Sequence, residues 1–397
     1  MARKIPPRNQ AQLVDLIRKH RVESAQKKLA RLFRVDHQVL QRSILKALQT
    51  LAADEHSRVF TKALRNRHWE VRVAAADIFG ETHDPDVIRL LVPLLKDPFM
   101  EVQVAVVHAL QKIGGKDVID PLIDALDRSS GRVKDDIADV LLWLTGKDLG
   151  TSHASWDGWW TVNRESAEVR GISREEFDRA RAEANRGLTG NYYGLRVISQ
   201  FVTFIVDTSG SMQEPYLVPS SEQGRGGGRR PGGTGVDPDS DEKKRGQGKR
   251  ETLQKIEVAQ RELARVLRQL RNGTQFNLVP FDSQYHLWRP GLVEMDDEIR
   301  EDALRFVEAL TAGGMTNIYD TLITALRDPE VNTLYFLSDG APTMGEVVDP
   351  DAILAKVREL NEVRKVKIHT IGFHLDPVAK VLMRRLAQEN HGSFVER

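Results

Sequence analysis

The spacing of apolar residues divides the chain into two parts with different periods. From residue 10 to about residue 146, apolar residues recur three or four positions apart, and the short turns between them contain Asp, Pro and Gly. This period predicts helices throughout that part of the chain. From residue 192 onward, short apolar runs alternate with amphipathic stretches. That alternation predicts a mostly parallel sheet with helices on both faces.

The helical part of the sequence repeats with a period of 31 residues. Val71, Val102 and Val133 are separated by this step. A second column with the same step consists of Phe33, Leu64, Leu95 and Leu126. About four units fit, each read as two antiparallel helices, and only stacking can bury their apolar faces. The sequence therefore predicts an all-α solenoid over residues 8–147.

One segment of the repeat also matches the residue pattern of a known repeat family. Residues 69–76 read Trp-Glu-Val-Arg-Val-Ala-Ala-Ala. They resemble the Val-Arg-x-x-Ala-Ala segment of short bacterial HEAT-like repeats. The resemblance implies a stack of HEAT-like repeats that serves as a binding surface with no chemistry of its own.

A joint of about 44 residues, 148–191, follows the repeats and is rich in tryptophan. It contains Trp156, Trp159 and Trp160, which are half of the 6 Trp in the chain. We expect these rings to seal the open end of the solenoid, as a capping segment must. A site that stacks carbohydrate rings or bases is the alternative. The charged run 173–187 is expected to form a bridging helix.

The second part, residues 192–397, is expected to form one α/β domain. Its predicted strands are 201–206, 276–281, 285–289, 333–338, 365–373 and 392–395, of which the third is antiparallel. Its predicted helices are 252–271, 296–310, 351–363 and 377–389. An insertion of about 214–250 is rich in Gly, Arg, Pro, Asp and Lys, and we expect it to be disordered.

Polar side chains follow the apolar run 201–206 directly. Asp207, Ser209 and Ser211 lie on the loop at its carboxyl end, which is where open α/β sheets bind ligands. One carboxylate with two hydroxyls is a set of hard oxygen donors. The set suits Mg²⁺ or another hard divalent cation and is poor for zinc.

Two later stretches add to this set. A Gly313-Gly314 turn leads to Thr316 and a helix, and the run 333–338 ends in Ser-Asp-Gly with Asp339. Together with Asp-x-Ser-x-Ser, these stretches resemble the von Willebrand factor A domain, also called the integrin I-type domain. The resemblance implies a doubly wound, Rossmann-like fold with strand order 3-2-1-4-5-6.

The resemblance also implies a metal-ion-dependent adhesion site. Ser209, Ser211 and Thr316 would be ligands, and Asp207 and Asp339 would bind the ion directly or through water. The ion would be Mg²⁺, with Mn²⁺ or Ca²⁺ as alternatives. The ion would be short of negative charge, so a carboxylate of a partner protein could replace a bound water.

The predicted partner is therefore a protein that bears an accessible Asp or Glu. Gly314, Asn317 and Gly340 flank the expected ligands and are candidate partner-binding residues. Proteins with this domain often work beside AAA+ ATPases of the MoxR kind, which the resemblance adds as a candidate partner. The repeats would hold a second partner, so the whole chain would be a non-catalytic scaffold.

The composition of the chain excludes some kinds of site and adds one alternative function. Cys is 0, which excludes disulfides and thiolate chemistry, and no apolar run approaches the length of a membrane span. We expect a soluble, cytoplasmic protein. The net charge is +1, but the first fifty residues carry 12 Lys and Arg against 3 acidic residues. Binding of RNA or DNA by this basic face, on the plan of the Ro RNA-binding proteins, is therefore an alternative function.

A metal-dependent hydrolase is a further alternative, since a cation at a strand end can activate water. Against it, Ser209 stands where the aspartate-phosphorylating hydrolases place a second carboxylate. The sequence also contains no Gly-rich Lys-Ser/Thr phosphate loop. The sequence therefore favours binding over catalysis.

Overall fold

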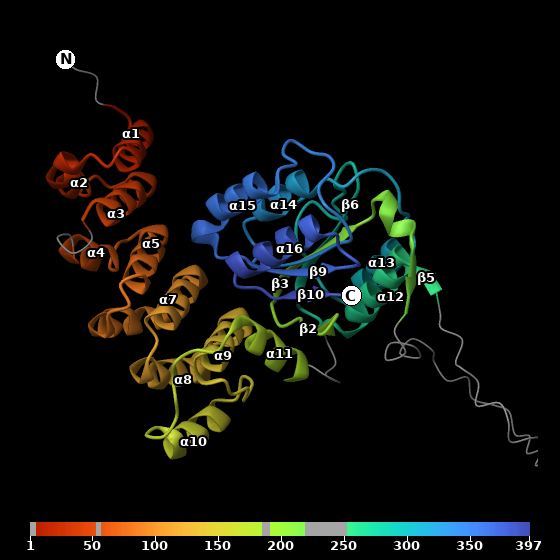
Figure 1. Cartoon of the computed structure of the whole chain (residues 1–397), viewed down its shortest axis with the longest axis horizontal. Coiled ribbons are helices and arrows are strands. Elements are labelled where there is room, and N and C mark those ends of the chain that lie inside the picture. Colours follow the sequence, from red (N-terminus) through yellow and green to blue (C-terminus); the bar gives the residue numbers. More distant parts are fainter. Residues whose placement is uncertain (1–4, 53–56, 185–190, 219–251) are drawn as a thin grey trace, which may run out of the picture. The chain divides into compact units, whose positions relative to one another are not determined.

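The computed structural model describes residues 5–52, 57–184, 191–218 and 252–397. It divides the chain into two compact units, one of Met1–Arg186 with Leu360–Lys365 and one of Gly187–Glu359 with Val366–Arg397. The first unit is built from helices and the second around a central sheet (Figure 1). This confirms the predicted fold class, an all-α repeat followed by a doubly wound α/β domain.

The first unit is a succession of helices joined by short turns, as Figure 1 shows from red to olive. Its helices are α1 (Pro7–Lys19), α2 (Gln26–Leu32), α3 (Gln38–Ala52), α4 (Ser57–Ala63), α5 (Trp69–Gly80), α6 (Ile88–Leu91), α7 (Met100–Ile113), α8 (Ile119–Arg128), α9 (Gly131–Thr145), α10 (His153–Asn163) and α11 (Arg174–Ala184). The 3-10 turns Pro85–Val87 and Val92–Lys96 flank α6, and Lys116–Val118 precedes α8.

The 31-residue period is the spacing between equivalent helices. The helices α3, α5, α7 and α9 begin at residues 38, 69, 100 and 131. Their third residues are all buried in one core: Leu40, Val71, Val102 and Val133. The residues of the second column, from Phe33 to Leu126, are buried in the same core. The predicted repeat is confirmed, and its first unit contains α3.

Polar contacts between successive repeats recur at the same step. The Arg72 guanidinium on α5 donates from Nε and Nη2 to the two carboxylate oxygens of Asp97, at 2.7 and 2.8 Å. One repeat earlier, the Asn66 amide donates to the Gln41 side chain at 3.2 Å. Arg72 and Asp97 are both buried, so their charges are paired in a forked geometry that suits an interior.

The tryptophans after the repeats are core residues. Trp156 and Trp160 on α10 are 0% and 2% exposed and belong to the core of the first unit. The Trp160 indole donates to Asp120 of α8 at 3.1 Å, and the Trp156 indole donates to the Gly150 carbonyl at 2.8 Å. Trp156 and Trp160 are buried as an aromatic plug would be and offer no stacking surface to a ligand, while Trp159 is half-buried against the same core.

Ion pairs hold the bridging helix α11 to α9. Arg181 forms ion pairs with Asp135 and Asp139 of α9 and with Asp148. Its guanidinium is largely buried, and the three carboxylates raise its pKa even though burial works to lower it. Residues 185–190 of the predicted bridge lie outside the described residues.

The second unit contains a six-stranded sheet with the order β10-β9-β8-β3-β6-β7. Its strands are β3 (Phe201–Asp207), β6 (Gln275–Phe281), β7 (Val293–Glu294), β8 (Thr333–Ser338), β9 (Lys367–Gly372) and β10 (Phe394–Glu396). When the six strands of this sheet are numbered 1 to 6 in chain order and the sheet is read from β7, the order is the expected 3-2-1-4-5-6. Only β7 is antiparallel to its neighbour.

Both faces of this sheet are covered by helices. Alternate residues of β3, namely Val202, Phe204 and Val206, share a core with α12 (Lys255–Gln269) and α13 (Asp297–Glu308). On the other face, the Thr370 hydroxyl of β9 donates to a carbonyl of α16 (Pro377–Glu389) at 2.9 Å. The remaining helices are α14 (Ile318–Arg327) and α15 (Pro350–Arg364), and the residues of α15 from Leu360 onward belong to the first unit.

Three predicted boundaries are wrong. The third strand is Val293–Glu294 and not 285–289, because Tyr285 is exposed and makes only an isolated bridge to Phe281. The sequence also predicts a lead-in strand over residues 192–199, but the structure has a small hairpin there, of β1 (Asn191–Tyr192) and β2 (Leu195–Arg196). The helix expected from residue 252 begins at Lys255, since Thr252–Gln254 is a strand, β5.

The predicted insertion begins later than expected. Residues 215–217 form β4 (Pro215–Leu217), which pairs antiparallel with β5. Tyr216 and Val218 are buried in the core of the second unit, which explains why this stretch is ordered. Residues 219–251, the rest of the predicted disordered insertion, lie outside the described residues. Across the described residues, no helix has both the length and the apolar character needed to cross a membrane.

Candidate metal centre

Two adjacent strands bring the predicted site together. In the sheet, β3 and β8 are neighbours and run parallel, with Val206 opposite Leu337. The carboxyl ends of both strands therefore lie at the same edge, although they are more than a hundred residues apart in the chain. Asp207 ends β3, and Asp339 follows the last residue of β8. Both are buried.

Asp207 is held by hydrogen bonds to both of its oxygens. Its Oδ1 accepts from the backbone N–H of Ser209 at 2.8 Å, and its Oδ2 accepts from the Ser338 hydroxyl at 2.5 Å. Burial raises the pKa of the Asp207 carboxyl to about 6, although the hydrogen bonds from Ser209 and Ser338 work to lower it. The charge of nearby Asp339 also raises this pKa. A divalent cation would stabilise the ionised form.

A hydrogen-bonded chain leads from the serines to the second carboxylate. The hydroxyls of Ser209 and Ser211 lie 3.2 Å apart. The Ser211 hydroxyl donates to Asp339 Oδ1 at 2.7 Å. The structure therefore brings Asp207, Ser209, Ser211 and Asp339 into one cluster of hard oxygen donors, as the sequence predicts.

Thr316 lies on a loop that packs against this cluster. The Gly313 N–H donates to the Thr208 carbonyl at 2.7 Å, and the Gly210 N–H donates to the Gly314 carbonyl at 3.1 Å. Thr316 is itself buried. All five candidate ligands are described residues, and among them the Thr316 hydroxyl makes no hydrogen bond to the other four. The loop is adjacent, but its hydroxyl is outside the chain of hydrogen bonds.

The donor chemistry fits a hard cation. The cluster offers two carboxylates and two hydroxyls, with a third hydroxyl on the adjoining loop, and no sulfur or imidazole takes part. Mg²⁺, Mn²⁺ and Ca²⁺ all prefer oxygen ligands of this kind.

Comparison with known families agrees with the fold of both units. Residues 57–141 match the family model for HEAT repeats, and residues 249–395 match the family model for the von Willebrand factor type A domain. The chain therefore carries HEAT repeats followed by a von Willebrand A domain. The matched segment includes Thr316 and Asp339 but not Asp207, Ser209 or Ser211, which follow the strand β3 that pairs with β8 of that segment.

Curated relatives match only part of this chain. Human von Willebrand factor A domain-containing protein 3B is 31% identical over 127 residues, which are 32% of this chain and 9% of the relative. Human inter-alpha-trypsin inhibitor heavy chain H4 is 28% identical over 240 residues, which are 56% of this chain and 21% of the relative. The chain thus spans less than a quarter of the length of either relative.

Solved structures match this chain at low identity and low TM-score. A von Willebrand factor type A protein from Catenulispora acidiphila is 18% identical, with a TM-score of 0.35, and the match covers 49% of this chain and 38% of that one. The PilB minor pilin from Streptococcus sanguinis is 15% identical with a TM-score of 0.32, and the match covers 51% of this chain and 58% of that one.

The von Willebrand A domain also contains a charged pair that the sequence does not reveal. The Lys255 ammonium at the start of α12 donates to Asp339 Oδ2 at 2.8 Å and to Glu214 at 2.6 Å. Burial works to lower the pKa of Lys255, but these two carboxylates hold it above its ordinary value. No spacing rule connects Lys255 to Asp339, because the contact depends on how α12 meets the strand ends.

The three candidate partner-binding residues have different surroundings. Asn317 is buried and caps α14, where its Oδ1 accepts from the Asp320 N–H at 3.2 Å. Gly314 has a positive φ of 76°, and a side chain there would collide with Ser283 at 2.8 Å. Gly340 follows Asp339 and has open space where a side chain would be. Their role in partner binding stays a prediction.

An open hollow lies beside the Thr316 loop. It has a volume of about 580 Å³ and is lined by residues that include Ser283, Tyr285, Asn317 and Met344. Tyr285 and Met344 are 40% and 41% exposed, and Met344 donates its N–H to the Thr316 carbonyl at 3.2 Å. Exposed apolar side chains beside the candidate metal ligands are typical of a surface that another protein covers.

Proposed function

We propose that the von Willebrand A domain binds a divalent cation, and through it a carboxylate of a partner protein. The observation that carries this proposal is the hydrogen-bonded cluster of Asp207, Ser209, Ser211 and Asp339 at one edge of the sheet. The apolar side chains beside Thr316 support it, because an acidic group alone gives a partner little buried area. Domains of this family typically mediate protein–protein interactions.

The residues would divide the work as follows. Ser209, Ser211 and Thr316 would hold the ion, while Asp207 and Asp339 would orient the hydroxyls and balance the charge. The bound cation would supply an electrophilic position for the carboxylate. We propose Mg²⁺ as the ion, an acidic protein as the ligand, and a scaffold role in which the HEAT repeats bind a second partner.

Calorimetric titration of Mg²⁺ and Mn²⁺ into chelator-treated protein tests the metal site. We expect the wild type to bind, and Asp207→Ala to weaken binding at least tenfold, because this residue orients Ser209. Asp296→Ala is the matched control, since it also removes a carboxylate but only caps α13, through Ile299. Absence of binding by the wild type, or equal binding by Asp207→Ala, would contradict the proposal.

Binding of a carboxylate to the metal ion is tested by a separate measurement. Water-proton relaxation by the Mn²⁺-loaded protein reports water that exchanges at the ion. Acetate, as the simplest carboxylate, is expected to reduce this relaxation as it replaces bound water. If acetate left the relaxation rate unchanged up to high millimolar concentration, binding of a partner carboxylate would be contradicted. The proposal of a metal site would still stand.

A further inference from the structure

A basic hollow lies in the first unit, and none of its lining residues belongs to the candidate metal cluster of Asp207, Ser209, Ser211 and Asp339. It has a volume of about 710 Å³, within the usual range for small-ligand sites. It lies where the turn after α2 meets the turn after α4, so two successive repeats form it. Its lining residues are Phe33, Arg34, Asp36, Gln41, Arg58, Thr61, Lys62, Arg65, Asn66 and Arg67.

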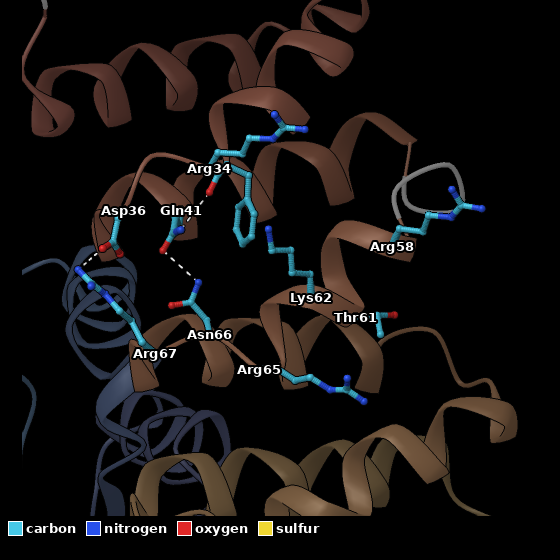
Figure 2. Close-up of a pocket in the computed structure, with 10 residues that line it drawn as sticks. Arg34, Asp36, Gln41, Arg58, Thr61, Lys62, Arg65, Asn66 and Arg67 are labelled. Carbon is cyan, nitrogen blue, oxygen red and sulfur yellow. Dashed lines mark hydrogen bonds and ion pairs between the residues drawn. The ribbon is translucent and has the colours of Figure 1, made fainter.

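The repeat itself places positive charge here. Arg34 and Arg65 are separated by the 31-residue step and occupy equivalent positions after α2 and α4. Figure 2 shows their side chains extending toward the same side, with Lys62 between them. Lys96, exposed, has the same position in the next repeat. Equivalent turns of a solenoid lie one above another, so the basic residues form a row along one edge.

Most of this charge is not balanced by a neighbouring carboxylate. Asp36 is the acidic member of the lining, and Arg67 and His68 already bind it. Within the described part of the chain, Arg34, Arg58, Lys62 and Arg65 form no ion pair, and all four are exposed. Four cations around one hollow repel one another and focus a positive potential into it.

The base of the hollow is ordered and offers no stacking surface. Gln41 is 5% exposed, donates to the Phe33 carbonyl at 3.0 Å and accepts from the Asn66 amide at 3.2 Å. Phe33, the aromatic residue of the lining, is only 4% exposed. A base or an aromatic side chain therefore has no ring face to stack on, and charge provides most of the attraction available.

We propose that this hollow binds an oligophosphate group through Arg34, Arg58, Lys62 and Arg65. Arginine donates paired hydrogen bonds that fit phosphate oxygens, and three of the four cations are arginines. Phosphates joined in a chain carry about one negative charge each in a small volume, which matches four cations better than carboxylates spaced along a peptide. A free oligophosphate, a nucleotide and a nucleic acid backbone all present this chemistry.

The test is a calorimetric titration of inorganic tripolyphosphate into the full chain, in a metal chelator so that the metal cluster takes no part. We expect binding that weakens as salt is added. Arg34→Glu/Arg65→Glu should weaken it at least thirtyfold. The control Lys27→Glu/Lys28→Glu makes the same change of charge on exposed residues of α2 outside the hollow, and should weaken it less than threefold.

Three further ligands identify the source of the phosphate. ATP, a short single-stranded RNA and polyglutamate are titrated into the wild type and both variants. Tighter binding of ATP or RNA that the hollow variant abolishes would support the site and name its source. Tighter binding of polyglutamate than of tripolyphosphate would overturn the oligophosphate proposal in favour of an acidic protein.

Folding of the variants is checked separately, although the substituted residues are exposed. Arg34→Gln/Lys62→Gln removes two charges without adding new ones and should weaken tripolyphosphate binding about tenfold, with an unchanged unfolding temperature. No binding by the wild type, or equal losses in the hollow variant and the α2 control, would overturn the proposal.

Discussion

At the scale of single residues, the sequence does not predict that Lys255 contacts the candidate metal cluster. Its ammonium group contacts Asp339 Oδ2 at 2.8 Å, so one carboxylate that would serve the cation already has a positive partner. The Lys255 side chain is 4% exposed and that of Asp339 is 0% exposed, so water screens their interaction little. The same ammonium group would repel a bound divalent cation.

Lys255→Met keeps the apolar stem and removes this charge. We expect roughly tenfold tighter Mg²⁺ binding, because the repulsion is gone and Asp339 becomes free to serve the ion. Without metal, the variant should unfold more easily by about 3 kcal/mol, since a buried carboxylate loses its partner. Calorimetry and thermal unfolding in chelator measure both effects. Lys356→Met on the surface pair with Glu359 is the control, and weaker Mg²⁺ binding by Lys255→Met would contradict this account.

The pKa of Asp207 predicts how the metal site depends on pH. Burial raises this pKa from its ordinary value of 3.8 to about 6. In metal-free protein the protonated group therefore favours folding, and this contribution is lost as the pH rises through 6. Metal binding has the opposite sign because it needs the ionised form.

We therefore expect Mg²⁺ to raise the unfolding temperature much more at pH 7.5 than at pH 5. The change should be centred near pH 6, the pKa of Asp207. Thermal unfolding with and without Mg²⁺ across this range measures it. In Asp207→Asn the Mg²⁺ effect should be small at every pH. A wild-type effect equal at pH 5 and pH 7.5 would show that Asp207 does not control binding.

At the scale of elements, the helical repeats depend on one very close approach. At Gly80, the last residue of α5, an added Cβ would lie 2.8 Å from the Ala109 Cα on α7. A side chain there must push α5 away from α7, and the two helices cannot then pack as closely. The small residues Gly80 and Ala109 thus set the spacing between two repeats.

Gly80→Ala is expected to destabilise the first unit by about 2 kcal/mol through this overpacking. The matched control is Gly158→Ala in α10, where a Cβ meets nothing within 4 Å. That change should stabilise the unit by about 0.5 kcal/mol, because alanine favours the helix. Chemical denaturation of both variants measures the difference. Equal effects at the two positions would contradict the packing argument.

At the scale of the whole molecule, the described residues form two hydrophobic cores that share no residue. One core contains the helices from α1 to α10, and the other contains the sheet with α12 and α13. A ligand stabilises only the unit that binds it. The metal cluster belongs to the second unit and the basic hollow to the first.

Differential scanning calorimetry should therefore resolve two transitions that respond to different additions. Mg²⁺ at about 100 times its dissociation constant should stabilise one unit by about 2.7 kcal/mol and leave the other transition in place. Tripolyphosphate, with no metal, should move the other transition, and Gly80→Ala should lower that same one. One transition that moves as a whole with every addition would show that the units unfold together.

The amino-acid sequence by itself determined the helical repeat, the main strands and helices of the second unit, and the candidate metal-ligating residues. The 31-residue step of Val71, Val102 and Val133 predicts the repeats because a stacked array must bury equivalent positions in the same way. The apolar run 201–206 and the Asp-x-Ser-x-Ser turn predict the site because parallel strands end at a common edge. The sequence reveals these features because each is a short motif or a fixed spacing that can be read without knowing how the chain folds.

Only the tertiary structure decided which distant side chains meet. Lys255 reaches Asp339 across 84 positions, and Arg34 joins Lys62 and Arg65 at one hollow because successive repeats stack in register. A stretch that composition assigns to a disordered insertion is ordered, since β5 returns to pair with β4 and since Tyr216 and Val218 are buried. These contacts depend on the packing of whole elements, which no short segment of sequence specifies.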